Sequence, residues 1–209
     1  MTNKGRLAAL LSDTCTVLPA NVEKETKTMN DIKPIETSYK GYLFRSRLEA
    51  RWAVFLDAIG AEWEYEPEGF ILPNGLHYLP DFKVKFTSGR KRIAKNEYIW
   101  LEVKGQITKI DKEKISLFSK AEPILIVGNI PDPDNWYWEI CDKSNEAGWF
   151  FDLEFVDGDY FPGVPCAAIG GGFHLNDGND NFPEYDKERT TDAYRKARRA
   201  RFEHGETPS

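Results

Sequence analysis

The sequence has few of the residues on which disulfide-stapled or zinc-clustered folds depend. It holds three scattered cysteines, Cys15, Cys141 and Cys166, and no Cys-x-x-Cys pair. Cysteines used in this way argue against a disulfide framework and a zinc ribbon, and they suit a reducing compartment. No stretch approaches the roughly 18 apolar residues of a membrane span. The short apolar patch near the start lacks the length and the cleavage site of a signal peptide. We therefore expect a cytoplasmic protein without a membrane partner.

Negative charge is distributed unevenly along the chain, whose net charge is −6. Residues 132–186 hold 13 acidic residues against the single Lys143. Residues 187–209 hold seven basic and four acidic residues, and residues 41–130 hold 14 basic and 12 acidic residues. A slightly basic centre beside one strongly acidic segment is compatible with DNA binding on one face.

Four segments differ in composition. Residues 1–38 are rich in Thr, Asn, Lys and Glu without a sustained period, which predicts a flexible N-terminal arm. Residues 39–131 carry the hydrophobic patterns of a folded core. Residues 132–186 mix aromatic and acidic side chains, and we expect a small strand-rich addition there. Residues 187–209 are predicted to form a basic C-terminal helix and tail.

The core pattern predicts an α/β fold. Apolar residues recur at helical spacing over 46–59, with Ser46 suited to the N-cap and Gly60 to the C-terminal stop. Further patterns predict a second helix and four strands, the apolar run 98–103 being a central strand: strands over 62–65, 82–86, 98–103 and 123–127, and a helix over 111–119. The order helix, three strands, helix, strand indicates a mixed sheet flanked by helices.

Three carboxylates and a lysine stand at defined places in this pattern. Glu49 falls on the first helix, Asp81 follows Pro80 directly, and Glu102 and Lys104 close the most apolar strand. Residues two apart on a strand share a face, so Lys104 is expected beside Glu102.

This set of residues fits metal-dependent cleavage of a phosphodiester. A divalent ion such as Mg²⁺, for which Mn²⁺ can substitute, prefers oxygen ligands and supplies both charge neutralisation and an activated water. We expect Asp81 and Glu102 to hold the metal, with the backbone carbonyl of Val103 as a further ligand. Glu49 would complete the metal shell or bind a second ion. Lys104 would orient the attacking water or stabilise developing negative charge.

The acid-x-Lys triplet has little specificity by itself. The chain contains four such triplets, and only Glu102-Val103-Lys104 lies on a hydrophobic strand. An acid and a lysine there are costly to bury without a ligand or partner. The alternative is that Glu102 and Lys104 occupy the solvent face of an edge strand. The additional presence of Asp81 and Glu49 favours the catalytic interpretation.

The Pro80-Asp81 and Glu102-Val103-Lys104 motifs resemble the PD-(D/E)XK nuclease superfamily. The surrounding text (FRSRLEARWAVFLDAIGAEWEYEPEGF, YLPDF and WLEVKG) is similar to phage and mobile-element nucleases within it, such as phage Holliday-junction resolvases and the endonuclease subunits of certain transposases. The resemblance covers about 90 residues, 39–130. It implies a restriction-endonuclease-like core, metal-binding roles for Glu49, Asp81 and Glu102, a catalytic role for Lys104, and products with 5′-phosphate and 3′-hydroxyl ends. The chain lacks the cysteine-rich insertions of some relatives.

Basic and polar side chains near these motifs are candidates for nucleic-acid contacts. Each has a plainer alternative as a solvated helix face or, for Gln106, a polar residue at a strand end. The C-terminal helix has five basic residues in seven and can instead dock onto the acidic segment 132–186. The candidates are Arg45, Arg47, Gln106, Lys109, Lys112, Arg195, Arg198 and Arg199.

The sequence as a whole predicts a Mg²⁺-dependent endonuclease acting on DNA, located in the bacterial host cytoplasm if phage-encoded. An exonuclease, nickase, junction resolvase or RNA-cutting enzyme is an open alternative, and a protein partner or a homodimer is compatible with the same residues. The rival from another class is a non-catalytic nucleic-acid-binding or interaction protein. The acidic segment 132–186 favours that rival, or it restrains the nuclease by covering its cleft.

Overall fold

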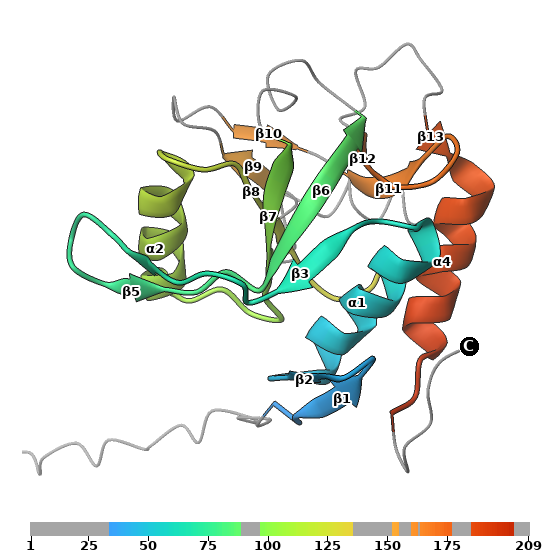
Figure 1. Cartoon of the computed structure of the whole chain (residues 1–209), viewed down its shortest axis with the longest axis horizontal. Coiled ribbons are helices and arrows are strands. Elements are labelled where there is room, and N and C mark those ends of the chain that lie inside the picture. The colour runs from blue at the N-terminus through green and yellow to red at the C-terminus, as the bar shows by residue number, and fades with distance from the viewer. Residues whose placement is uncertain are drawn as a thin grey trace, which may run out of the picture. The chain divides into compact units, whose positions relative to one another are not determined.

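The computed structural model shows an α/β fold in which a curled mixed sheet is flanked by helices (Figure 1). In the described part of the chain, no helix is long and apolar enough to cross a membrane. Most of the predicted N-terminal arm falls outside that part, although the first strand begins at Thr37. The structure describes residues 34–88, 97–135, 152–154, 160–162, 164–176 and 185–202.

The centre of the sheet is built from β3 (Trp63–Tyr65), β6 (Phe82–Ser88), β7 (Tyr98–Val103) and β8 (Ile124–Val127). Strand β6 pairs antiparallel with both β3 and β7, and β7 pairs parallel with β8. Five of the six residues of β7 are buried, as expected for a strand with neighbours on both sides and layers on both faces. The predicted strands, and the central position of 98–103, are therefore confirmed.

Later strands extend this sheet at both edges. Beyond β8 lie β9 (Asp152–Glu154) and β10 (Tyr160–Pro162). Beyond β6 lie β12 (Phe173–Asn176), β11 (Val164–Ala168) and β13 (Tyr185–Asp186). The predicted strands of 132–186 thus exist in the described residues, and they join the central sheet instead of building a separate layer.

Helix α1 (Arg47–Ile59) forms where its sequence pattern predicts. The side chain of Ser46 accepts a hydrogen bond from the Glu49 backbone N–H and so caps the first turn. Gly60 ends the helix in the left-handed conformation, with φ of 76°, which a residue without Cβ adopts at little cost. A short hairpin of β1 (Thr37–Tyr39) and β2 (Tyr42–Phe44) precedes the helix.

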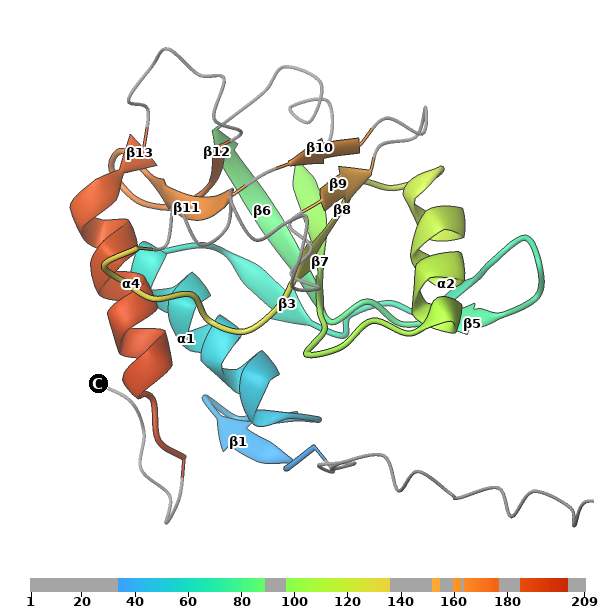
Figure 2. The same cartoon turned by 180° about the vertical axis from the view of Figure 1, so that it is seen from behind.

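Two hydrophobic clusters hold the layers together, one on each face of the sheet (Figures 1 and 2). On one face, α1 packs against the sheet, and the C-terminal helix α4 (Lys187–Arg199) packs beside α1 and against β11, near the edge of the sheet. On the other face, α2 (Lys109–Ser119) packs with a small hairpin, β4 (Phe70–Ile71) and β5 (His77–Tyr78). Strand β7, which carries Glu102, therefore packs into a hydrophobic cluster on each face, and β6, which Asp81 directly precedes, packs into the cluster on the α1 side.

The two later helices differ from their predicted bounds. Helix α2 begins two residues before the predicted 111, because Thr108 and Asp111 form a reciprocal capping box. Helix α4 ends at Arg199, where Ala200 leaves the helical conformation. The buried face of α4 consists of Thr190, Ala193, Tyr194 and Ala197.

The ring of Tyr194 anchors α4 in the core and gives a first prediction. It stacks on Phe55 with ring centroids 4.4 Å apart, and its hydroxyl donates a 2.5 Å hydrogen bond to the Pro165 carbonyl. Tyr194→Phe leaves that buried carbonyl without its donor, so unfolding free energy should fall by about 1–2 kcal/mol. Thermal unfolding followed by circular dichroism should show Tm lower by roughly 2–8 °C. The exposed Tyr42→Phe is the control, and an equal Tm for all three proteins would contradict this anchoring role.

Candidate metal-dependent active site

The strand register brings Asp81 and Glu102 together. Phe82 pairs with Leu101 between β6 and β7, so Asp81, one residue before β6, lies opposite Glu102. Both carboxylates are buried, with exposures of 1% and 2%. Side chains opposite each other on neighbouring strands share a face. The sheet thus places two acids side by side where water barely reaches them.

Asp81 is held by one backbone and one side-chain donor. Its Oδ2 accepts a 2.7 Å hydrogen bond from the Val103 N–H, and its Oδ1 is paired with the Arg45 guanidinium. Burial raises the pKa of Asp81 well above its ordinary value, and the nearby charges of Glu102 and Glu49 raise it further. The hydrogen bond from Val103 and the charge of Arg45 oppose this change and lower the pKa.

Glu102 has one engaged oxygen and one without a donor. Its Oε1 pairs with Lys104 Nζ at 2.9 Å, whereas its Oε2 is buried and has no hydrogen-bond partner. The Tyr78 hydroxyl is buried nearby and likewise makes no hydrogen bond of good geometry. Burial raises the pKa of Glu102, against the lowering effects of Lys104 and Tyr78. Burial and the charge of Glu102 in turn raise the pKa of Tyr78 far above its usual range.

Lys104 follows the strand end and contacts acids of two elements. Its Nζ lies 2.9 Å from Glu102 Oε1 and 3.5 Å from Asp111 Oδ1, in the first turn of α2. Burial lowers the pKa of Lys104, but the charges of Glu102, Asp81 and Asp111 more than offset this effect and raise it overall. The ammonium is therefore protonated at neutral pH, which favours charge stabilisation over proton abstraction as its role.

Glu49 occupies a different setting from the other two acids. Its Oε1 accepts a hydrogen bond from Ser46 Oγ at 2.7 Å. Its Oε2 accepts from the Tyr65 hydroxyl at 2.6 Å and from the Arg45 N–H at 3.1 Å. Both oxygens are thus engaged by protein donors at the start of α1. The expected metal role of Glu49 stays a prediction, and these bonds favour a structural one.

The donor set can be weighed against the needs of a divalent cation. Among the residues that the structure describes, no three His, Cys, Asp or Glu side chains gather closely enough to hold a metal. The pair Asp81 and Glu102 nonetheless supplies two carboxylates, and Glu102 Oε2 is a buried oxygen that makes no well-formed hydrogen bond, although the Tyr78 hydroxyl lies close enough to lower the pKa of Glu102. Mg²⁺ is commonly bound through one or two carboxylates plus waters and substrate phosphates. The residues present therefore fit such an ion.

The predicted nucleic-acid contacts fall into two separate groups. Arg45 and Arg47 lie at the start of α1, while Gln106, Lys109 and Lys112 are exposed around the start of α2, next to Lys104. On α4, which packs against α1 on the opposite sheet face from α2, Arg195 pairs with Asp192 and Asp134, and two neighbouring arginines are exposed. Of these residues, Arg45 contacts the acid pair directly through Asp81, and Arg195 is instead paired with Asp192 and Asp134.

Sequence reasoning missed four residues that surround the acids. Asp111 had a usable signal, since Thr108-x-x-Asp111 is a capping pattern. Tyr65, Glu66 and Tyr78 had none, because their approach to the site depends on turns and packing. Glu66 in particular adopts a positive φ of 44°.

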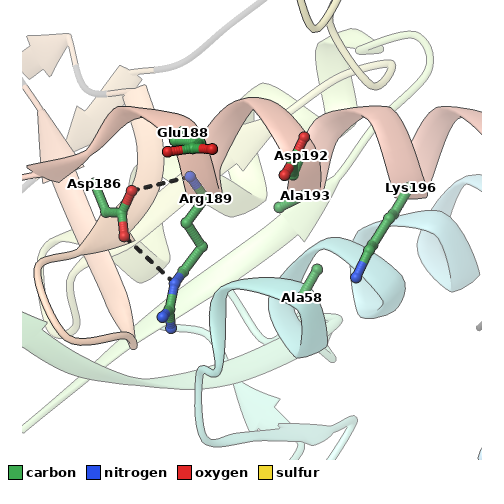
Figure 3. Close-up of a pocket in the computed structure, with 7 residues that line it drawn as sticks. All are labelled: Ala58, Asp186, Glu188, Arg189, Asp192, Ala193 and Lys196. Atoms are coloured by element: carbon green, nitrogen blue, oxygen red, sulfur yellow. Dashed lines mark hydrogen bonds and ion pairs between the residues drawn. The ribbon is translucent and has the colours of Figure 1, made fainter.

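A surface pocket of about 280 Å³ lies elsewhere, between the last turn of α1 and the first half of α4 (Figure 3). Its wall mixes acidic and basic side chains, and Arg189 in it is paired with Asp186. The pocket contains none of the predicted site residues. It is lined by Ala58, Asp186, Glu188, Arg189, Asp192, Ala193 and Lys196.

Comparison of the chain with protein-family models, with curated proteins and with solved structures found no match. The resemblance inferred from the sequence motifs thus stays a prediction, and the argument for a function rests on the geometry above.

The raised pKa of Glu102 predicts a pH-dependent gain from removing its charge. A carboxyl whose folded-state pKa is raised favours folding at low pH and loses that contribution as the pH rises through the folded-state pKa. Without divalent cations, Glu102→Gln should therefore raise Tm at pH 8 by about 2–4 °C, or roughly 1 kcal/mol. The gain should shrink as the pH is lowered toward 4.5, the ordinary pKa of a glutamate.

Calorimetry from pH 4 to pH 8 would measure this difference, at about one-unit steps. The control is Glu64→Gln, at an exposed position of β3, which should leave Tm unchanged across the range. A Glu102→Gln protein less stable than the wild type at pH 8 would show that the buried carboxylate is well compensated.

Proposed function

We propose that this chain is a metal-dependent nuclease that hydrolyses phosphodiester bonds of DNA. The observation that carries the proposal is the pair of buried carboxylates, Asp81 and Glu102, with the protonated Lys104 on the same face. Burying two like charges side by side costs stability, and a folded protein tolerates such a cost chiefly where function requires it. A divalent cation would offset that cost directly.

The element order supports the finer assignment to a restriction-endonuclease-like core. Helix α1, strands β3, β6 and β7, helix α2 and strand β8 follow the order that the PD-(D/E)XK resemblance implies, with the β4–β5 hairpin inserted between β3 and β6. Asp81 directly precedes β6 and Glu102 lies near the end of β7, so the two motif acids are opposite each other in this antiparallel pair. Glu102 lies on a central strand and Lys104 directly follows it, which supports the proposal over a solvent-facing edge strand.

In the proposed reaction, Asp81 and Glu102 would hold a Mg²⁺ ion, with the Val103 carbonyl as a further ligand. When bound, that ion supplies charge neutralisation on the phosphate and lowers the pKa of a bound water. The Val103 N–H fixes the orientation of the Asp81 carboxylate. Lys104, kept protonated by Glu102 and Asp111, places a positive charge where the phosphate becomes more negative.

Nucleic acid is a suitable substrate because two helix N-termini meet at the acids. Helix α1 begins beside Glu49 and Arg45, and α2 begins beside Asp111 and Lys104. Ser46 and Thr108 each cap one first-turn N–H, and the helix dipole at such ends favours phosphate nearby. The exposed Lys109 and Lys112 on α2 add positive charge along the same side. DNA rather than RNA is proposed from the family resemblance, and RNA is the alternative substrate.

Cleavage assays test the proposal directly. Labelled single-stranded DNA, duplex DNA, branched DNA and RNA should be incubated with Mg²⁺, Mn²⁺ or EDTA. We expect cutting of DNA that requires the cation, and a rate about 100- to 1000-fold lower for Lys104→Ala, which loses the positive charge at the phosphate. Lys120→Ala removes a matched charge at the exposed end of α2 and should cut normally. Binding without cutting by the wild type would favour the non-catalytic alternative.

Salt dependence of binding would identify the surface that DNA follows. Each phosphate contact that is lost reduces the slope of log affinity against log salt by about one. With Ca²⁺ in place of Mg²⁺, a Lys109→Ala, Lys112→Ala double variant should lower that slope by about two relative to the wild type. An Arg198→Ala, Arg199→Ala variant removes the same charge from α4 and should leave the slope unchanged. The reverse result would move the DNA path to the C-terminal helix.

A further inference from the structure

The guanidinium of Arg45 reaches from the start of α1 onto the acid pair. Its Nη2 contacts Asp81 Oδ1, and its Nε lies 2.6 Å from Glu66 Oε1. The side chain is 52% exposed, whereas that of Asp81 is 2% exposed. Arg45 therefore covers the buried carboxylate from the solvent side. No other side-chain cation is paired with Asp81 in the described residues.

Glu66 is the second acidic partner of the Arg45 guanidinium, and the backbone of Glu66 is strained. Its φ of 44° is uncommon for a residue other than glycine, and such conformations cluster at functional sites. Its N–H donates a 2.9 Å hydrogen bond to the carbonyl of Asp81, which ties the two acids' backbones together. The Glu66 side chain is 23% exposed, but the Oε1 that contacts Arg45 is itself buried.

The two buried acids differ in how their charge is compensated. Glu102 is paired with Lys104 from its own strand. Asp81 receives a backbone N–H on Oδ2, and its remaining oxygen, Oδ1, faces Arg45. A buried carboxylate without a cation is strongly unfavourable. Arg45 thus supplies the positive charge that Asp81 needs in this structure.

A divalent cation bound through Asp81 would need the same oxygen. Because Oδ2 is engaged by the Val103 N–H, Oδ1 is the oxygen that remains for a metal, and Arg45 contacts it. The guanidinium and the ion carry the same sign and would compete for one site. After its release from Asp81, the Arg45 guanidinium would keep Glu66 as a partner, and its planar N–H donors could bind a substrate phosphate.

We propose that Arg45 is the resident counter-ion of Asp81, displaced by the divalent cation and then available to the scissile phosphate. This inference rests on the proposed function, since it assigns a partner to the same acid pair. In this role Arg45 competes with the metal for Asp81. The opposite role would be to hold Asp81 in position for the metal. The two roles predict opposite changes in cation affinity when the arginine is removed.

Isothermal titration calorimetry with Ca²⁺ and with Mn²⁺, in the absence of DNA, separates these roles. Arg45→Gln should bind either ion with a Kd roughly twofold to fivefold lower than the wild type, the range expected when one partly exposed ion pair is lost from the competing state. Without added cation, its Tm should fall below that of the wild type, because Asp81 loses its counter-ion.

Two further variants keep the test sharp. Arg47→Gln removes an equal charge at the first residue of α1. It should change the Kd by less than about twofold if Arg45 acts by competing for Asp81 and not through the overall positive potential of the region. Arg45→Lys keeps the charge but loses the planar bridge to Glu66, so it should tighten binding in the same direction by a smaller factor. This variant also serves if Arg45→Gln does not fold.

The titrations distinguish failure of the proposed Arg45 role from failure of the metal site itself. Unchanged or weaker cation binding by the Arg45 variants, with clear binding by the wild type, would overturn the counter-ion role and leave the nuclease proposal standing. An equal gain for Arg47→Gln and Arg45→Gln would also overturn it. Absence of cation binding in the wild type and all variants at millimolar concentration would overturn the metal site itself.

Discussion

The burial of two carboxylates side by side is the constraint around which the site is built. Asp81, directly before β6, lies opposite Glu102 on β7, and burial together with the charge of Glu102 raises the pKa of Asp81. The surrounding hydrogen-bond donors and positive charges offset part of this electrostatic cost. Val103 and Arg45 are donors to Asp81, and Lys104 is a donor to Glu102, whose second oxygen has only the poorly aligned Tyr78 hydroxyl nearby. The protein thus keeps an electrostatic deficit that a cation can fill.

The fold makes this arrangement rigid. The antiparallel register of β6 and β7 sets the spacing of the acids, and hydrophobic clusters hold β7 on both faces and β6 on one. Helices α1 and α2 begin at the same end of the site, so their first turns supply Glu49 and Asp111 as anchors for Arg45 and Lys104. A site held on strands and helix ends keeps its geometry better than one held on loops.

Much of this could be predicted from the sequence, because the relevant signals are local. The period of the first helix, its cap at Ser46 and its stop at Gly60 agree with α1, and the apolar run of β7 is a central strand. The separation of Asp81 and Glu102 in adjacent strands follows from alternation and order. Their position beside Lys104 was therefore foreseeable.

The rest depends on contacts between distant segments. The positive φ of Glu66 and the bond from Tyr65 to Glu49 leave no trace in hydrophobic periodicity. The engagement of both Glu49 oxygens was accordingly missed, as was the pairing of Arg45 with Asp81. The docking of α4 on α1 likewise depends on Tyr194, whose buried role an isolated helix pattern cannot reveal.

The most direct test of the central claim is a crystal structure of the protein grown with Mn²⁺, with anomalous diffraction measured at the manganese edge. We expect an anomalous peak within bonding distance of carboxylate oxygens of both Asp81 and Glu102, about 2.1–2.3 Å away. We also expect that the Arg45 guanidinium has left Asp81 in that crystal. A crystal with Mn²⁺ bound elsewhere, and with Arg45 still on Asp81, would contradict the central claim.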